Sequence, residues 1–310
     1  RTVLGYHVPN DVADDLIKNL GLPAASAKQL YGTCLFTDAE KYSTLSETIT
    51  PKELSSFMND YYKTIFAPVR AQGGVISDVI GDSMMAIWAS TSPDRDLRKH
   101  ACMAALDINR SVENFNKTSK SLHLPTRIGV ESGQIAMGHV GALDHFEYRA
   151  VGDCVNTASR IENLNKLLGT RILVSNRVLH DLDMFFTREV GSFLFYGKSR
   201  PVVVHELISL MDECHEYQKE VCRIFNEALT AFRNRDWTEA MRLFCSSARL
   251  NEGDGPSYFY MRFCMLYRKS PPPEEWDGVI QVGKDNEDYK ENDQGSNLKA
   301  IGDHPITSLQ

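Results

Sequence analysis

Short strand-like segments alternate with long amphipathic segments between about residue 33 and residue 207, and this alternation constrains the fold more than any other feature. Residues 33–37 form a short β-type run that ends at Asp38. After Pro51, apolar residues recur at helical spacing over about five turns, which predicts an amphipathic helix. Strands separated by helices of this length predict an α+β or α/β fold in which helices cover a sheet.

Two strand pairs are expected within this region. Residues 75–80 and 83–88 read as strands joined by a tight turn at Gly81-Asp82. Residues 127–131 and 134–140 are expected to pair around Ser132-Gly133. The other expected elements are helices over 97–115 and 155–167 and strands at 171–174, 193–196 and 202–207.

The chain is expected to have four parts. Residues 1–30 read as a lead-in helix or linker, residues 31–210 as the main domain, and residues 271–310 as a polar, disordered tail. Between them, residues 211–270 carry two helical stripes separated by a turn at 233–236 and resemble a single tetratricopeptide-type unit. Because a lone unit of this type cannot bury its apolar face, we expect it to pack on the main domain or on a partner.

Composition excludes several classes of function. Among 310 residues, 34 Lys and Arg stand against 41 Asp and Glu, for a net charge of −7. This balance predicts no nucleic-acid partner, because such partners require basic patches. The sequence contains neither a signal peptide nor a membrane-spanning stretch, so this fragment is expected to make no membrane contact. It begins at Arg1 rather than Met, as a piece of a longer protein would.

The seven cysteines are scattered and form no CxxC pair. An odd, dispersed set of this kind is typical of reduced thiols. We therefore expect a cytoplasmic location, which includes the cytoplasmic part of a membrane-anchored protein, and we do not expect zinc.

Two aspartates stand at positions suited to a metal site. Asp38 ends the first strand, and Asp82 lies at the tip of the Gly81-Asp82 hairpin. In an antiparallel sheet a strand end and a neighbouring hairpin tip can lie within a few ångströms, and two carboxylates there suit Mg²⁺ or Mn²⁺. The competing interpretation is that each aspartate is an ordinary turn residue.

Asn156 and Arg160 form a second candidate pair. They are four residues apart and share one face of the helix that is expected from residue 155. An amide and a guanidinium that project together near a helix start suit an oxygen-rich anion. The competing interpretation is a solvated helix face.

Together, these residues resemble the class III nucleotidyl cyclases, the family of adenylate and guanylate cyclases, over residues 31–207. The run from Asp78 to Trp88 and the segment from Tyr148 to Asp153 resemble bacterial adenylate cyclases found behind a membrane-anchored sensor. The segments that carry the resemblance are Phe36-Thr37-Asp38, Tyr42-Ser43-Thr44-Leu45, Gly73-Gly74 through Ile80-Gly81-Asp82, Arg127-Ile128-Gly129-Val130, and Val151-Gly152-Asp153 through Ser159-Arg160.

The resemblance implies a fold, metals and a reaction. The implied fold is α+β, with a ferredoxin-like antiparallel core sheet, covering helices and a small C-terminal helical segment. Asp38 and Asp82 would hold two Mg²⁺ or Mn²⁺ ions, with the Ala39 carbonyl as a further ligand. The ions would lower the pKa of the ribose 3′-hydroxyl and neutralise charge on the α-phosphate, and pyrophosphate would leave in line.

The resemblance also implies roles for other residues. Asn156 would orient the ribose, and Arg160 would stabilise charge developing on the α-phosphate. The turn that contains Ala39, Tyr42, Ser43 and Thr44 would cradle the β- and γ-phosphates, and Lys198 would bind the triphosphate or be a solvated loop lysine. Family sites form between two subunits, so a chain that carries both sets of residues implies a homodimer.

Three positions depart from the family pattern. Asp78 and Arg149 occupy the two purine-selecting positions, and their hydrogen-bonding groups suit either adenine or guanine. Lys41 stands where the family usually has glycine. The resemblance to bacterial enzymes favours adenylate cyclase, with ATP as substrate; the alternatives are a guanylate cyclase that uses GTP and a catalytically silent regulatory module.

Overall fold

The computed structural model describes residues 27–118, 122–142 and 145–283. Most of the expected lead-in, residues 1–26, and the end of the expected tail, residues 284–310, lie outside the described residues. The chain divides into two compact units. The first unit contains the chain up to Val190 and residues 203–214, and the second contains residues 191–202 and the chain from His215 onward.

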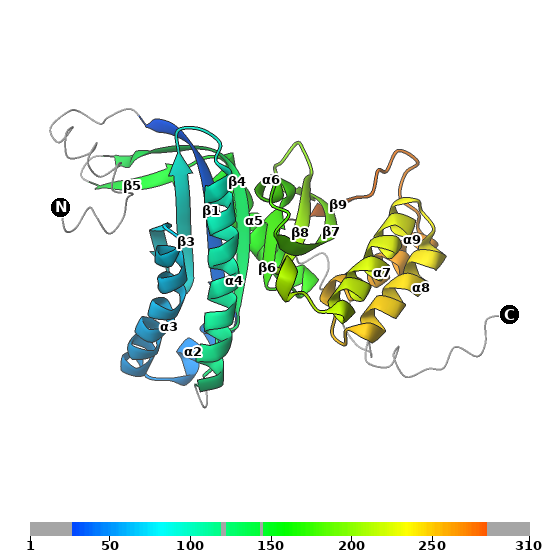
Figure 1. The fold of residues 1–310 in the computed structure, drawn as a ribbon, viewed down its shortest axis with the longest axis horizontal. Coiled ribbons are helices and arrows are strands. Elements are labelled where there is room, and N and C mark those ends of the chain that lie inside the picture. Colours follow the sequence, from blue (N-terminus) through cyan, green and yellow to red (C-terminus); the bar gives the residue numbers. More distant parts are fainter. Residues whose placement is uncertain (1–26, 119–121, 143–144, 284–310) are drawn as a thin grey trace. The chain divides into compact units, whose positions relative to one another are not determined.

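An antiparallel sheet forms the core of the first unit (Figure 1). Strand β1 (Lys28–Ala39) lies between β3 (Ser83–Ser90) and β4 (Thr126–Ala142), and β2 (Val75–Ile80) pairs with the outer side of β3. The order β2-β3-β1-β4, with a helix before β2 and another before β4, is that of a ferredoxin-like core. The expected α+β fold is confirmed.

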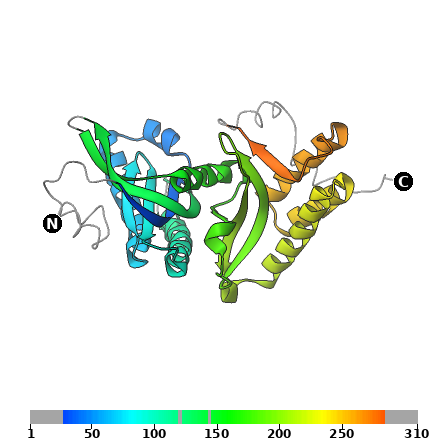
Figure 2. The same cartoon turned by 90° about the horizontal axis from the view of Figure 1, so that it is seen from above.

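Helices cover both faces of this sheet, as Figures 1 and 2 show. Alternate residues of β1 point to opposite faces, so Leu35 packs with helices α3 (Pro51–Ala71) and α4 (Arg95–Thr118), whereas Cys34 packs with helix α5 (Asp153–Leu168). Asp38 has the same parity as Cys34, so the alternation places it on the α5 face. The helix expected over 155–167 is therefore the element closest to the first predicted metal aspartate.

The predicted hairpin at Gly81-Asp82 is confirmed, with Ile80 paired to Ser83 and Gly81 at a φ of +60°. The second predicted pair is wrong. Residues 126–142 form one continuous strand, and Thr33 and Gly32 of β1 pair with Ser132 and Gly133. The chain reverses later instead, and β5 (His145–Val151), which was not predicted, pairs with the second half of β4.

Beyond β4 the sheet continues through β6 (Ile172–Ser175), β8 (Val202–Leu210) and β7 (Phe185–Phe195) to β9 (Val279–Val282). Strand β6 is parallel to β4. The remaining short elements of the first unit are α2 (Tyr42–Thr48), α6 (Asn176–Leu179) and a 3-10 turn, η2 (Met211–Glu213).

The described part of the second unit contains three helices where two were predicted: α7 (Glu216–Arg233), α8 (Trp237–Leu250) and α9 (Gly255–Lys269). Asp254 caps the third helix by accepting a hydrogen bond from the backbone N–H of Ser257. Tyr260 is fully buried, and its ring contacts those of Phe225, Phe232 and Phe244. The third helix therefore supplies part of the core that a lone pair would lack.

The beginning of the predicted disordered tail is folded. Arg235 donates hydrogen bonds to the carbonyls of Pro272 and Pro273, and Trp276 donates to the carbonyl of Val279. Residues 279–282 form strand β9, which pairs in parallel with β7. The polar composition of this segment, on which the prediction of disorder rested, does not reveal such contacts.

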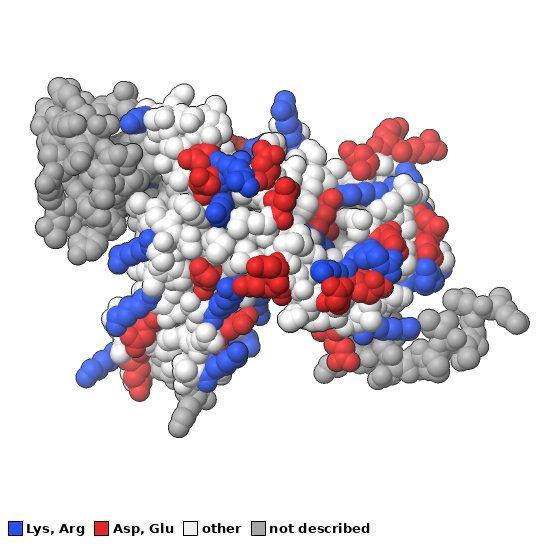
Figure 3. Space-filling view, in the orientation of Figure 1, with Lys and Arg blue, Asp and Glu red and all other residues white. Residues whose placement is uncertain are grey.

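Positive and negative side chains are interspersed on the face shown in Figure 3. On the second unit this reflects pairs along single helices, such as Arg223 with Glu220 and Glu227. Within the described residues, no helix combines the length and the apolar character that a membrane span requires.

Candidate active site

The structure brings Asp38, Ala39 and Asp82 together where β1 ends beside the β2–β3 turn. The backbone N–H of Ala39 donates to Asp82 Oδ2 at 3.2 Å. Burial raises the pKa of Asp82, and the charge of Asp38 raises it further. Two carboxylates whose charges repel in this way are expected to attract a cation.

Two cationic side chains of the same chain lie against Asp38. Arg127 Nη1 is 3.1 Å and Lys166 Nζ 3.3 Å from Asp38 Oδ2. Neither cation was predicted as a site residue. Arg127 could have been found, because it opens one of the family-like segments and stands opposite Asp38 in the β1–β4 register. Lys166 could not, because only the packing of α5 on β1 brings it near.

Glu40 binds the side of the Arg127 guanidinium that does not contact Asp38. Arg127 Nη2 donates to Glu40 Oε1 at 2.6 Å, and Arg171 Nη1 donates to Glu40 Oε2 at 2.7 Å. Burial alone would raise the pKa of Glu40, but Arg171 and Arg127 together hold it below its ordinary value. Arg127 is thus clamped between Asp38 and Glu40, and only 12% of its side chain is exposed.

Glu162 is buried beneath this cluster. Its side chain is on α5, and burial together with the charge of Asp38 raises its pKa to about 8. Within the described residues, its Oε1 atom has no hydrogen-bond partner. The helix can approach the sheet here because Gly129 has no side chain: a Cβ there would lie 2.2 Å from the backbone nitrogen of Glu162.

The turn that was predicted to bind the phosphates comes directly after β1 in the chain. Tyr42, Ser43 and Thr44 form the first turn of α2, and Ser43 and Thr44 are exposed. Lys41, immediately before them, has a φ of +68° in the left-handed region. Glycine adopts this conformation without steric cost, which gives a physical reason for glycine at this position in the family.

Asn156 and Arg160 lie towards the other end of α5. Asn156 is exposed, and Arg160 is half-buried with an Nη1 atom that is buried and has no hydrogen-bond partner among the described residues. Asn156 precedes Lys166, which contacts Asp38, by ten residues, or about 15 Å along the helix axis. Within one chain, therefore, the structure does not bring Asn156 to the aspartate pair.

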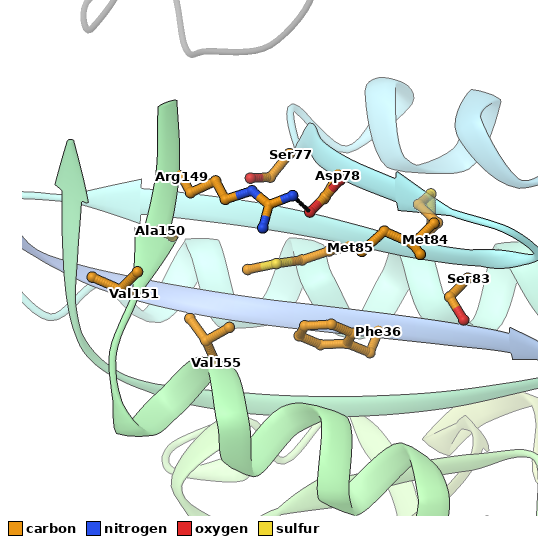
Figure 4. A pocket seen from close by; sticks show the side chains of 11 residues that line it. Phe36, Ser77, Asp78, Ser83, Met84, Met85, Arg149, Ala150, Val151 and Val155 are labelled. Carbon is orange, nitrogen blue, oxygen red and sulfur yellow. Dashed lines mark ion pairs between the residues drawn. The ribbon is translucent and has the colours of Figure 1, made fainter. Parts of the chain in front are cut away.

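Asp78 and Arg149 meet in a pocket of about 260 Å³ (Figure 4). Arg149 Nη2 is 3.0 Å from Asp78 Oδ2. The β2–β3 register shifts between Ile76 and Asp78, and such an irregularity re-aims the side chain beside it. The other walls are largely apolar, formed by Phe36, Met84, Met85, Ala150, Val151 and Val155.

Lys198 belongs to the second unit and follows β7. Its backbone N–H donates to the carbonyl of Phe195 at 3.0 Å. Its suggested contact with a triphosphate stays a prediction.

The donor set at Asp38 and Asp82 fits Mg²⁺ or Mn²⁺. Both ions prefer carboxylate oxygens, and Mg²⁺ commonly takes one or two carboxylates and completes its shell with water and substrate phosphates. Across the described ranges, no group of three or more His, Cys, Asp or Glu side chains could hold a metal. The pair alone is therefore an incomplete shell, suited to a metal that arrives with a phosphate ligand.

Comparison with known proteins gives one family. Residues 27–209 match the adenylate and guanylate cyclase catalytic domain. Over 66% of this chain, the sequence is 32% identical to adenylate cyclase 1 of Rhizobium meliloti, of which it covers 31%. Over 64% of the chain it is 31% identical to an adenylate cyclase of Anabaena cylindrica, of which it covers 41%. The chain thus spans less than half the length of these relatives.

The fold agrees with a solved structure. The adenylyl cyclase CyaB from P. aeruginosa superposes with a TM-score of 0.54 at 22% identity, over 62% of this chain and all of that one. At this identity the similarity shows the fold alone.

Proposed function

This chain belongs to the adenylate and guanylate cyclase family, the class III nucleotidyl cyclases, and we propose that it converts ATP into 3′,5′-cyclic AMP and pyrophosphate. The observation that carries the proposal is the arrangement along α5. The aspartate pair lies near one end, and an exposed amide and a buried guanidinium nitrogen with no hydrogen-bond partner among the described residues lie towards the other. Phosphoryl transfer combines metal ions with an arginine that stabilises the charge of the transition state, and the two ends of α5 offer residues for both roles.

Asp38 and Asp82 would hold two Mg²⁺ or Mn²⁺ ions, with the Ala39 carbonyl as an additional ligand. When bound, such ions promote loss of the 3′-hydroxyl proton and neutralise charge on the phosphates. Arg127 keeps Asp38 oriented, because Glu40 holds the guanidinium from its far side. The exposed turn at Ser43 and Thr44 would receive the β- and γ-phosphates, with Lys198 as a further triphosphate ligand.

Asn156 and Arg160 would act on the ribose and the α-phosphate. A phosphoryl oxygen would give Arg160 Nη1 the partner that it lacks within the described residues. The family resemblance assigns Asn156 the ribose, which its exposed amide can reach.

A homodimer would complete the site. About 15 Å of helix separates Asn156 from Lys166, which contacts Asp38. One molecule of ATP would therefore bind to the aspartates of one subunit and to the N-terminal part of α5 of the other. Twofold symmetry then produces two equivalent sites. The seven free cysteines support a reducing, cytoplasmic location for this assembly.

The Asp78–Arg149 pair would read the purine. Asp78 can accept from adenine N6–H₂ while Arg149 donates to N1, and the apolar walls can enclose the ring. Guanine is the second candidate, because Asp78 can accept from its N1–H and N2–H₂ and Arg149 can donate to O6. The two relatives at 31–32% identity carry the name adenylate cyclase, which favours ATP.

A direct assay tests the proposal. The protein is incubated with Mn²⁺ or Mg²⁺ and with ATP or GTP separately, and the cyclic product is quantified. We expect cyclic AMP from ATP and much less product from GTP. Product from GTP alone would show a guanylate cyclase, and no product from either nucleotide would favour a silent regulatory module.

A further inference from the structure

We propose that Lys166 is the resident counter-ion of the two metal-binding aspartates: divalent ions displace it from Asp38, and it then binds the polyphosphate of the nucleotide. The inference rests on the proposed function, because it takes Asp38 and Asp82 as the metal ligands. It assigns a role in the site to a residue for which neither the motif nor the resemblance suggested one.

Lys166 contacts Asp38 directly, and its charge also acts on Asp82. Its Nζ atom is 3.3 Å from Asp38 Oδ2. Its charge also lowers the pKa of Asp82 against the effect of burial. No other lysine of the described residues forms an ion pair with either aspartate.

The two cations on Asp38 differ in how firmly they are held. Arg127 is clamped between Asp38 and Glu40 and is almost buried. Lys166 has 40% of its side chain exposed, and its polar partners among the described residues are Asp38 and the neutral amide oxygen of Asn163, at 3.0 Å. A flexible, solvated ammonium on a single carboxylate can leave at low cost, whereas the clamped guanidinium cannot.

Charge balance provides the reason for Lys166 to move. Without metal, Asp38 pairs with both Arg127 and Lys166, and Arg127 also pairs with Glu40. Divalent ions on the same oxygens make the local charge strongly positive, and Lys166 then lies beside cations rather than anions. The nearest new anion in the proposed reaction is the polyphosphate that arrives with the metal, and later the pyrophosphate that leaves.

The two roles predict opposite effects of one substitution. In Lys166→Gln the competitor of the metal is lost, so nucleotide-free protein should bind Mn²⁺ about fivefold more tightly. The same variant lacks the later phosphate contact, so at saturating Mn²⁺ it should bind inorganic tripolyphosphate about fivefold more weakly. If Lys166 had only a structural role, its replacement would not raise the affinity for Mn²⁺ while lowering the affinity for tripolyphosphate.

The experiment measures Mn²⁺ binding by electron paramagnetic resonance and tripolyphosphate binding by calorimetry. Lys166→Arg keeps the charge and should bind both ligands nearly as the wild type does. Lys63→Gln removes another exposed, ion-paired lysine, which contacts Asp60, and should change neither affinity. Thermal unfolding of each variant verifies that it is folded.

Each outcome decides the question. Tighter Mn²⁺ binding with weaker tripolyphosphate binding in Lys166→Gln supports the inference. Unchanged or weaker Mn²⁺ binding, or unchanged tripolyphosphate binding, overturns it. Asp38→Asn separates this failure from that of the proposed function: if Mn²⁺ binding depends on Asp38 but not on Lys166, only the inference fails, and if it does not depend on Asp38, the proposed metal site fails as well.

Discussion

The two ends of helix α5 carry polar side chains in opposite states. Near its C-terminus, Lys166 pairs with Asp38, so its charge already has a partner within the chain. Towards its N-terminus, Asn156 is exposed and Arg160 has a buried nitrogen with no hydrogen-bond partner in the part of the chain that the structure describes. The difference teaches that the ion pairs around Asp38 are formed within one chain, whereas Arg160 has no such partner among the described residues.

The largest expected effect tests whether two chains share each site. Asp38→Ala and Asn156→Ala should each abolish cyclase activity. In a mixed dimer of the two variants, one of the two sites receives both intact residues. A random mixture should therefore recover about one quarter of wild-type activity, measured as cyclic product, once dimers have exchanged subunits.

A mixture of Asp38→Ala with Asp82→Ala is the matched control. Both substitutions damage the same end of the site, so no mixed dimer contains an intact one and activity should stay absent. Recovery in this control, or none in the first mixture when mixed dimers are present, would contradict the sharing of sites.

The next largest effect compares two arginines. Arg160→Ala should lower kcat by about 10²–10³-fold, because it removes a donor to charge that develops in the transition state. It should leave the free energy of unfolding nearly unchanged, since its buried Nη1 has no described partner to lose. Arg127→Ala should lower the free energy of unfolding by about 1–3 kcal/mol, because Asp38 and Glu40 lose a donor.

Steady-state kinetics and urea unfolding separate these outcomes. Arg160→Lys should regain only part of the rate, because an ammonium lacks the planar fork of donors. If Arg160→Ala were as unstable as Arg127→Ala, the unpaired state inferred for Arg160 would be wrong.

A pH-dependent effect on stability concerns the buried acid of helix α5. Glu162 has a pKa of about 8 against an ordinary value of 4.5, so between these values the folded protein holds a proton that the unfolded chain has lost. The free energy of unfolding must therefore fall as the pH rises from about 4.5 to 8. In EDTA, the free energy of unfolding of Glu162→Gln should rise by about 5 kcal/mol relative to that of the wild type between pH 4.5 and pH 8.

Urea titrations at several pH values measure this gain. Glu47→Gln, at an exposed position on α2, should follow the wild-type dependence on pH. A difference between Glu162→Gln and wild type that is constant with pH would mean that Glu162 titrates normally.

The smallest effect tests the turn beside the aspartates. Lys41→Gly should raise the free energy of unfolding by about 0.5 kcal/mol, because relief of the left-handed conformation slightly exceeds the entropy that glycine loses on folding. Lys41→Ala loses the same charge but keeps the conformational cost, and should show no gain. Urea unfolding of both variants separates the effect of losing the lysine charge from the effect of relieving the left-handed backbone conformation.

The elements that were predicted correctly are those whose start or turn is marked by residues next to each other in the sequence. Pro51 and the helical spacing of apolar residues after it predicted the start of α3, where the structure adds a capping box of Thr50 and Glu53, and Gly81-Asp82 predicted the hairpin. Ser132-Gly133 was misread as a turn, although β1 pairs with β4 through these residues. Turn propensity cannot anticipate a partner strand that is about 100 residues away in the sequence.

The site shows the same limit. The sequence predicted Asp38 and Asp82 because each occupies a recognisable strand end or turn, and it predicted Asn156 and Arg160 because their spacing places them on one helix face. Lys166 and Glu162 were missed, because their roles depend on how α5 packs on the sheet and on charges from β1. Tertiary contacts of this kind cannot be recognised from the spacing of residues in the sequence.

The close approach at Gly129 has a consequence for how a dimer of this chain would work. Since a Cβ there would lie 2.2 Å from the backbone nitrogen of Glu162, α5 and β4 are in direct backbone contact at this point. In the proposed dimer, each subunit would hold its contributions to both catalytic centres on this closely packed helix and sheet. A change in the relative orientation of the subunits would therefore displace parts of both centres together.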